Sequence, residues 1–453
     1  MSWANSPGKT LSQPACGLSQ IYRDPRWNQT LTTVIPMSIL ISPCTQLLTL
    51  AGSPLARRGL AQDELGLVQQ GAVLIEGETI RAVGLASDLE NRYGNGCDQR
   101  IGAEGCVVLP GFVDSHAHPV FVSPRDHEYE QRIQGATYQE IAERGGGILS
   151  SVRAVRSTSR DELLHLSQRR VARALEYGTT TIEAKSGYGL DLENETKILE
   201  VIRELRRCLP LELVPTFLGA HEIPPEYRCQ KPAYISLLIN EMIPLIARRQ
   251  LAEFCDCFVE PHLFSISEAE QIGRAALRHG LGVRLHADQL TRSGATQLGV
   301  RLGAISVDHL DQIEAEDIQA LAGSQTIATL LPGSVFHLGL SRYPPARTLI
   351  NANVAVALAT DFNPGSSPTL SMQMVLSLAC TQMRMTPAEA IVAATINGAH
   401  ALGRAGRFGS LETGKQADLC IMEVEDYRQI PYFFGMNHCR MTIKKGNIVY
   451  QRG

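Results

Sequence analysis

Short apolar runs alternate with helix-like segments about eight times through the middle of the chain, and this repeat limits the possible folds more than any other feature. The runs occupy residues 107–114, 179–183, 213–218, 257–260, 283–285, 304–307, 326–331 and 354–359. Amphipathic segments separate most of them, among them 161–177, 194–208 and 267–279, the last expected to begin at Ser267. The alternation predicts a parallel (β/α)8 barrel of the TIM type. A doubly wound open sheet is the alternative, but the sequence has neither a Gly-rich dinucleotide fingerprint nor a phosphate loop.

Both ends of the chain are β-rich. Residues 71–84 and 441–450 each predict two short strands about a turn, and residues 417–423 predict one more strand. We therefore expect a small β-sandwich domain built from both chain ends. The predicted organisation is a poorly ordered extension at 1–36, the N-terminal segment of the β-sandwich at 37–109, the barrel at 110–408 and the C-terminal segment of the β-sandwich at 409–453. Met37 begins the first strand-like run, so a start at either methionine fits the sequence.

Composition narrows the class of partner. The formal net charge is −4 and no basic stripe is present, so we expect a small-molecule substrate and no nucleic acid. No apolar run reaches the ~20 residues that span a bilayer, so no membrane partner is expected. The chain has 11 cysteines without a repeated spacing, which favours reduced thiols and a cytoplasmic location. The sequence leaves the oligomeric state open, and a homodimer is compatible with it.

Histidine and aspartate follow several of the predicted barrel strands. His116 and His118 end the first strand two residues apart, so both side chains can face the barrel mouth. His286 ends the fifth strand, His309 the sixth and Asp361 the eighth. Each residue alone could fill a structural hydrogen-bonding role, but together they predict a metal site.

The ligand chemistry agrees with that prediction. Three neutral imidazoles and one carboxylate suit a single divalent or trivalent ion, Zn or Fe, with an open position for water. Asp361 can bind the ion, take a proton from that water, or do both in turn. His309 can then polarise a substrate carbonyl.

This strand-by-strand pattern resembles the amidohydrolase superfamily, whose members carry H-x-H on strand one, His on strands five and six and Asp on strand eight. Two-metal members commonly add a carboxylated Lys on strand four; residues 258–262 contain none, so one ion is expected. Two blocks, E-A-K-S-G-Y-G-L at 183–190 and D-F-N-P-G-S at 361–366, are similar to the imidazolonepropionase family. The similarity runs from about Met37 to the C-terminus.

That resemblance implies hydrolysis of 4-imidazolone-5-propanoate to N-formimino-L-glutamate in histidine degradation. It implies metal ligands at His116, His118, His286 and Asp361, and a substrate site that includes Arg125, Tyr188, His221, Asn363, Gly365 and Ser366. A guanidinium can hold the propionate through two hydrogen bonds.

Simpler structural roles remain open for several of these residues. Arg125 could form a surface ion pair, Tyr188 could pack in a turn, and His221 could cap local backbone. Lys185 receives no catalytic role, because a structural ion pair explains it equally well.

Two other functions remain as rivals. Related purine or pyrimidine deaminases share the metal pattern, but many carry Glu three residues after the strand-five His, where this chain has Gln289. Gln289 cannot exchange protons near neutral pH, so we expect it to orient substrate or water while Asp361 moves the proton. A non-catalytic barrel that serves as a scaffold is the second rival, and the complete set of ligand positions argues against it.

Overall fold

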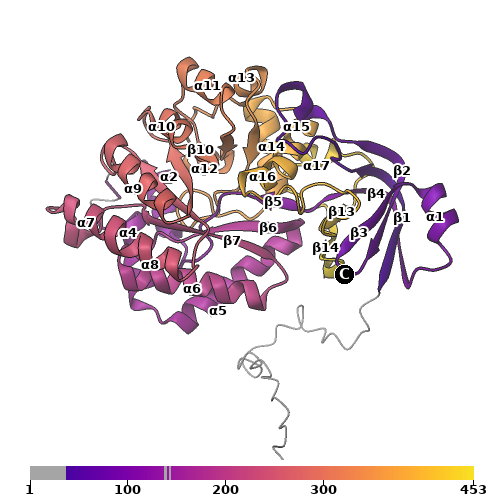
Figure 1. The fold of residues 1–453 in the computed structure, drawn as a ribbon, viewed down its shortest axis with the longest axis horizontal. Coiled ribbons are helices and arrows are strands. Elements are labelled where there is room, and N and C mark those ends of the chain that lie inside the picture. The colour runs from indigo at the N-terminus through magenta and orange to yellow at the C-terminus, as the bar shows by residue number, and fades with distance from the viewer. Residues whose placement is uncertain (1–36, 137–139, 142–143) are drawn as a thin grey trace, which may run out of the picture. The chain divides into compact units, whose positions relative to one another are not determined.

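The computed structural model describes residues 37–136, 140–141 and 144–453 of the chain. These residues form an eight-stranded sheet and a seven-stranded sheet (Figure 1). The extension predicted at residues 1–36 lies outside the described residues, and the other domain boundaries stay predictions.

The eight-stranded sheet is the barrel, and its parallel strands follow one another in chain order. They are β5 (Phe112–Asp114), β6 (Thr179–Lys185), β7 (Glu212–Ala220), β8 (Phe254–Val259), β9 (Gly282–Ala287), β10 (Ser306–His309), β11 (Ile327–Leu330) and β12 (Val356–Leu358). The first and last strands meet just beyond their carboxyl ends. There the Asp361 amide donates to the His116 carbonyl at 3.0 Å, and the His118 amide donates to the Phe362 carbonyl at 2.8 Å. These bonds join the two edges, which confirms the barrel over the open sheet.

One predicted strand is divided between the two sheets. Residues 107–110 belong to β4 (Gln99–Pro110) of the seven-stranded sheet, and the barrel begins only at Phe112. Gly111 separates the two, where a Cβ atom would lie 2.2 Å from Cγ2 of Thr180. The apolar run over 107–114 therefore spans two strands, because apolar character continues through the point where the chain leaves one sheet for the other.

Helices connect the barrel strands and cover the outside of the barrel (Figure 1). They include α2 (Asp126–Ile133), α4 (Ile148–Ser157), α5 (Arg160–Ala172), α6 (Leu192–Cys208), α7 (Lys231–Leu237), α8 (Ile243–Arg248), α9 (Ile266–Arg278), α10 (Ala295–Leu302), α11 (Ala315–Ala322), α12 (Pro332–Leu338), α13 (Ala346–Asn351), α14 (Met372–Met383), α15 (Pro387–Ala393) and α16 (Ile396–Ala401). The expected start of α9 at Ser267 was wrong. Ser265 caps this helix, because its side chain accepts from the Glu268 amide while the Glu268 carboxylate accepts from the Ser265 amide.

The seven-stranded sheet combines both ends of the chain, as the sequence predicts. Its order is β15-β14-β13-β4-β1-β2-β3, and Figure 1 shows the indigo and yellow strands side by side. The remaining strands are β1 (Ser38–Leu48), β2 (Leu67–Glu76), β3 (Thr79–Leu85), β13 (Leu419–Met422), β14 (Cys439–Lys444) and β15 (Asn447–Gln451), with α1 (Ala86–Tyr93) and α17 (Gln429–Tyr432) beside them. The two ends join where β4 pairs antiparallel with β13. The sheet has an apolar core of its own that includes Ile41, Val73, Val108, Ile421 and Ile443.

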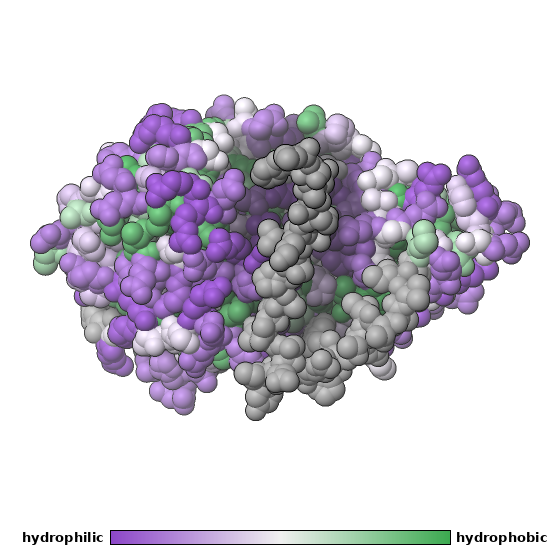
Figure 2. Space-filling model, turned by 60° about the horizontal axis from the view of Figure 1, so that its bottom comes forward, coloured by the Kyte–Doolittle hydropathy of each residue, from purple (hydrophilic) through white to green (hydrophobic). Residues whose placement is uncertain are grey.

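Hydrophilic side chains cover most of the face seen in Figure 2, with hydrophobic ones in small patches between them. The apolar residues of the barrel strands are instead enclosed between the strands and the surrounding helices. Among the described residues, none of the helices combines the length and the apolar character needed to cross a membrane.

Candidate active site

Four predicted ligands meet at the carboxyl end of the barrel. His116 and His118 follow β5, His286 lies in β9 and Asp361 follows β12. All four side chains are buried, with at most 3% of each residue exposed. The sequence brings them together because every barrel strand ends at the same rim.

The distances between the ligand atoms fit one metal ion. Nε2 of His118 lies 3.3 Å from Nε2 of His116 and 3.4 Å from Nε2 of His286. Oδ1 of Asp361 lies 3.6 Å from Nε2 of both His116 and His118. Ligands held about 2.0–2.1 Å from a tetrahedral zinc ion lie roughly 3.3–3.4 Å apart, so the measured spacing matches such a site.

Carboxylates behind two of the histidines fix the direction of these nitrogen atoms. Nδ1 of His116 lies 2.7 Å from Oδ2 of Asp308, and Nδ1 of His286 lies 2.9 Å from Oδ2 of Asp256. A carboxylate oxygen beside Nδ1 favours the tautomer with the proton on that nitrogen, which leaves each Nε2 with a lone pair directed at the centre. Neutral His118 has one ring proton and could donate it to Nε2 of only one of His116 and His286. A cation between the three Nε2 atoms would accept the lone pairs of all three.

Burial keeps the histidines neutral. It lowers the pKa of His116, His118 and His309 well below the ordinary value, and neighbouring groups such as Lys185 and His286 lower it further. Neutral imidazole is the form that binds a metal ion. Burial also raises the pKa of the Asp361 carboxyl to about 7, although His286 opposes the shift.

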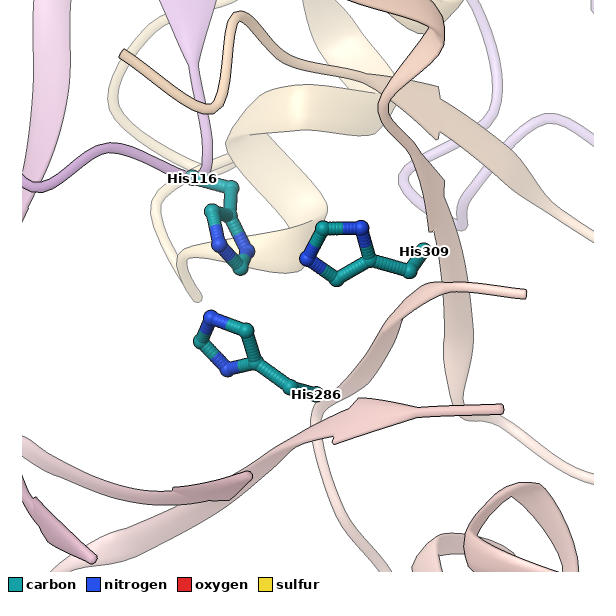
Figure 3. A group of neighbouring side chains, drawn as sticks. All are labelled: His116, His286 and His309. Carbon is teal, nitrogen blue, oxygen red and sulfur yellow. The ribbon is translucent and has the colours of Figure 1, made fainter. Parts of the chain in front are cut away.

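His309 lies beside the ligands at the end of β10. Its ring centroid is 5.2 Å from that of His286 and 5.4 Å from that of His116, and the three rings surround a common space (Figure 3). His309 has φ +83° and Asp361 has φ +53°, a left-handed conformation that non-glycine residues rarely adopt. Such strain costs on the order of 1–3 kcal/mol and gathers at functional sites, which agrees with a role for both residues.

Arg125 is a buried cation with unused donors. It precedes α2, and its Nε and Nη1 atoms have no hydrogen-bond partner among the described residues. The nearest carboxylate oxygen, Oε2 of Glu128, lies 3.6 Å from Nε. Glu128 is itself engaged, because its Oε1 accepts from the Gly147 amide at 3.0 Å. The ion pair considered for Arg125 is therefore present with Glu128, but it is buried and not at the surface, and Nη1 remains a donor for an anionic ligand.

Gly365 makes room for that guanidinium. A Cβ atom at Gly365 would lie 1.2 Å from Nη2 of Arg125, so no other residue fits there without moving the arginine. The structure thus links two residues that the sequence places more than 200 positions apart, and it gives Gly365 a spacing role beside Arg125.

Tyr188 and His221 form an aromatic wall next to the ligands. The His221 ring stacks on His118 with centroids 5.2 Å apart, and the Tyr188 ring lies 5.5 Å from that of His221. Nδ1 of His221 lies 2.9 Å from the Gly187 carbonyl, so the backbone contact considered for this residue is present. Burial, reinforced by His286, lowers the pKa of His221 to about 3 and keeps its ring neutral.

The loop after β12 is organised by Asn363. Its Nδ2 donates to the Asp361 carbonyl at 2.6 Å, and its Oδ1 accepts from the amides of Gly365 and Ser366, both at 2.8 Å. Ser366 continues the chain of contacts, since its Oγ donates to Oδ2 of Asp361 at 3.3 Å. Asn363 therefore shapes the loop that presents Asp361.

Gln289, three residues after His286, is half-buried beyond the end of β9.

Sequence reasoning considered an ion pair for Lys185 but missed the set of charged residues to which it belongs, beneath the ligands. Glu183, Lys185, Asp256, Arg284 and Asp308 are buried on four barrel strands, and we call them the charged cluster. Charged residues at alternate positions inside apolar runs were the available signal. The structural ion pair considered for Lys185 is present, since its Nζ lies 2.7 Å from Oδ2 of Asp256.

The sequence matches the Amidohydrolase family over residues 123–450. It is 51% identical to the imidazolonepropionase of Solibacter usitatus over 409 residues, which cover 90% of this chain and 98% of that protein. It is 46% identical to the imidazolonepropionase of Geobacillus kaustophilus over 420 residues, which cover 92% and 98%.

Two solved structures share the fold. A zinc-bound adenosine deaminase from Xanthomonas campestris superposes with a TM-score of 0.69 at 18% identity, covering 90% of this chain and 92% of that one. Guanine deaminase from E. coli superposes with a TM-score of 0.70 at 15% identity, covering 92% and 99%. At such low identity the likeness to these deaminases is one of fold alone.

Proposed function

The chain belongs to the imidazolonepropionase family of the amidohydrolases, and from that membership we propose how its site residues divide the reaction, the hydrolysis of 4-imidazolone-5-propanoate to N-formimino-L-glutamate. The observation that carries the proposal is the convergence of three histidine nitrogens and one carboxylate oxygen, together with a buried arginine whose Nη1 has no hydrogen-bond partner among the described residues.

His116, His118, His286 and Asp361 would hold one ion, Zn or Fe. The fourth barrel strand, β8, contains no lysine that could bridge a second ion, and Lys185 is engaged in the charged cluster. The ion would supply a hydroxide nucleophile near neutral pH, because a divalent cation lowers the pKa of water from about 16 to about 7.

Arg125 would anchor the substrate by its propionate. A carboxylate brought to Nη1 would satisfy a donor that is otherwise buried without a hydrogen-bond partner among the described residues. Tyr188 and His221 would line the ring, since both lie beside His118. This arrangement favours a ligand with an anionic tail over an uncharged purine.

Asp361 would carry the proton. It accepts a proton from the attacking water and delivers it to the ring nitrogen as the bond between that nitrogen and the carbonyl carbon breaks. His309 would donate a hydrogen bond to the carbonyl oxygen, on which negative charge develops. Gln289 would orient substrate or water through its amide, and Ser366 would hold the second oxygen of Asp361.

Replacement of one ligand tests the proposal. His118→Ala should lose bound metal and turnover together, because an open site with one ligand fewer binds its ion poorly. His279→Ala, at an exposed position at the end of α9, is the matched control and should keep both. A His118→Ala protein that retains stoichiometric metal and full turnover would remove this residue from the site.

The cellular location, the oligomeric state and the partners of the protein are also proposals. The ten described cysteines are free thiols, in keeping with the reducing cytoplasm predicted from the sequence. The homodimer and the lack of nucleic-acid or membrane partners are also predictions from the sequence.

A further inference from the structure

The charged cluster lies directly behind the ligand histidines and is fully enclosed. All five of its side chains are 0% exposed. It holds three carboxylates and two cations, which leave one net negative charge when all are ionised. Buried charges are costly unless each one is paired, so the position of every member depends on the others.

Lys185 is the cation that contacts both carboxylates behind the ligands. Its Nζ lies 2.7 Å from Oδ2 of Asp256 and 3.7 Å from Oδ2 of Asp308. It also lies 2.9 Å from Oε2 of Glu183. Arg284 contacts only one of the two, with Nη2 3.1 Å from Oδ2 of Asp308.

The oxygen atoms that Lys185 approaches are the same ones that face the histidines. Oδ2 of Asp256 lies 2.9 Å from Nδ1 of His286, and Oδ2 of Asp308 lies 2.7 Å from Nδ1 of His116. The other oxygen of Asp256 accepts from the amides of Cys257 and His286, so this carboxylate is held on every side. One ammonium therefore stands behind two ligand nitrogens on two different strands.

We propose that Lys185 is a positioning residue of the metal centre, which acts on His286 and His116 through Asp256 and Asp308 and so sets how tightly the site holds its ion. The ammonium keeps both carboxylates in place as acceptors for the Nδ1 protons, and this contact aims each Nε2 at the ion. The inference rests on the proposed metal site. It goes further by assigning control of metal affinity to a residue that touches no ligand histidine side chain in the described contacts.

Replacement by an uncharged side chain of similar length isolates this role. Zn²⁺ affinity of the metal-stripped protein is measured by competition with a chromophoric chelator, and the visible spectrum of the Co²⁺-loaded protein reports ligand geometry. Lys185→Met should weaken Zn²⁺ binding by roughly 10- to 100-fold, the range for losing an outer-shell partner of a ligand, and should change the Co²⁺ spectrum.

Lys444→Met is the matched control. Lys444 is a second buried strand lysine, 2.6 Å from Oδ2 of Asp418, but it lies in β14 of the other sheet. It should lower stability while leaving Zn²⁺ affinity and the Co²⁺ spectrum at wild-type values. An unchanged affinity and spectrum in Lys185→Met, or equal weakening in both variants, would overturn the inference.

A charge-balanced variant covers the case in which Lys185→Met does not fold. Lys185→Met with Glu183→Gln removes one charge of each sign and leaves the amide to accept from Arg284 and Thr216. It should fold and show the same weakened Zn²⁺ binding, and wild-type affinity there would refute the role of Lys185. A wild-type protein that binds no ion is a different result, because it refutes the metal site itself.

Discussion

At the residue scale, Arg125 shows what buried donors without hydrogen-bond partners can mean. Arg125 is only 8% exposed, yet two of its guanidinium nitrogens have no hydrogen-bond acceptor among the described residues. A buried donor without a partner calls for an explanation, and an anionic ligand would supply one here. The sequence indicated this residue only through the family resemblance, because nothing in P-R-D distinguishes it from a surface arginine.

Arg125→Lys keeps the charge and loses the planar fork, so substrate binding should weaken by about 1–3 kcal/mol, the range for a charge-assisted hydrogen bond. Steady-state kinetics should show the change as a raised KM with a smaller effect on kcat. An unchanged KM would place the propionate elsewhere.

Asp361→Asn should lower kcat by more than roughly 10²-fold per bound ion, because an amide cannot accept the proton of the attacking water. Gln289→Glu should stay folded and keep measurable turnover, since it preserves shape and leaves the proton route through Asp361 intact. Metal content is measured on both variants so that a lost ion is not mistaken for a lost base. Full activity in Asp361→Asn, together with no activity in metal-replete Gln289→Ala, would show that Asp361 is not the residue that transfers the proton.

At the element scale, strand ends could be predicted from the sequence and loop contacts could not. The period of two expected at the end of the first barrel strand and the common rim of the barrel were enough to bring His116, His118, His286 and Asp361 together. The loop after β12 needed coordinates, because the contact between Gly365 and Arg125 joins segments far apart in the chain. The pairings inside the charged cluster are of the same kind, since each joins different strands.

Gly365→Ala tests the loop directly. The added methyl group would displace the Arg125 guanidinium, so KM should rise as it does in Arg125→Lys while the fold is retained. Gly406→Ala is the control, because a Cβ atom at Gly406 meets nothing within 4 Å. Equal KM values for the two alanine variants would show that Gly365 does not position Arg125.

At the scale of the whole molecule, the sequence predicted the barrel and the β-rich unit from both ends, because both rest on periodicity along the chain. The apolar run over 107–114 did not show by itself that it spans two strands, since apolar character alone does not say which sheet a residue joins. The sequence prediction also placed the start of α9 two residues late, because it did not take account of the reciprocal contacts between Ser265 and Glu268.

Stability of the whole chain should also depend on pH through His400 in α16. Burial, reinforced by Lys415 and Arg57, lowers the pKa of His400 to about 4 from the ordinary value of 6.5. Between these values the unfolded chain binds more protons than the folded one, so the free energy of unfolding is highest above pH 6.5 and falls as the pH drops toward 4. Urea unfolding at pH 7 and pH 5 should show that the free energy of unfolding falls less in His400→Gln than in the wild type. Equal falls would remove His400 from the pH dependence.

The most direct test of the account is turnover of a substrate panel by the purified protein, before and after removal of metal by a chelator. The panel contains 4-imidazolone-5-propanoate, short cyclic amides and aminopurines. We predict that 4-imidazolone-5-propanoate is the preferred substrate, that its ring opens to N-formimino-L-glutamate, and that the activity disappears with the metal and returns when Zn²⁺ or Fe²⁺ is restored. Deamination of an aminopurine as the main activity, or ring opening that survives complete metal removal, would contradict it.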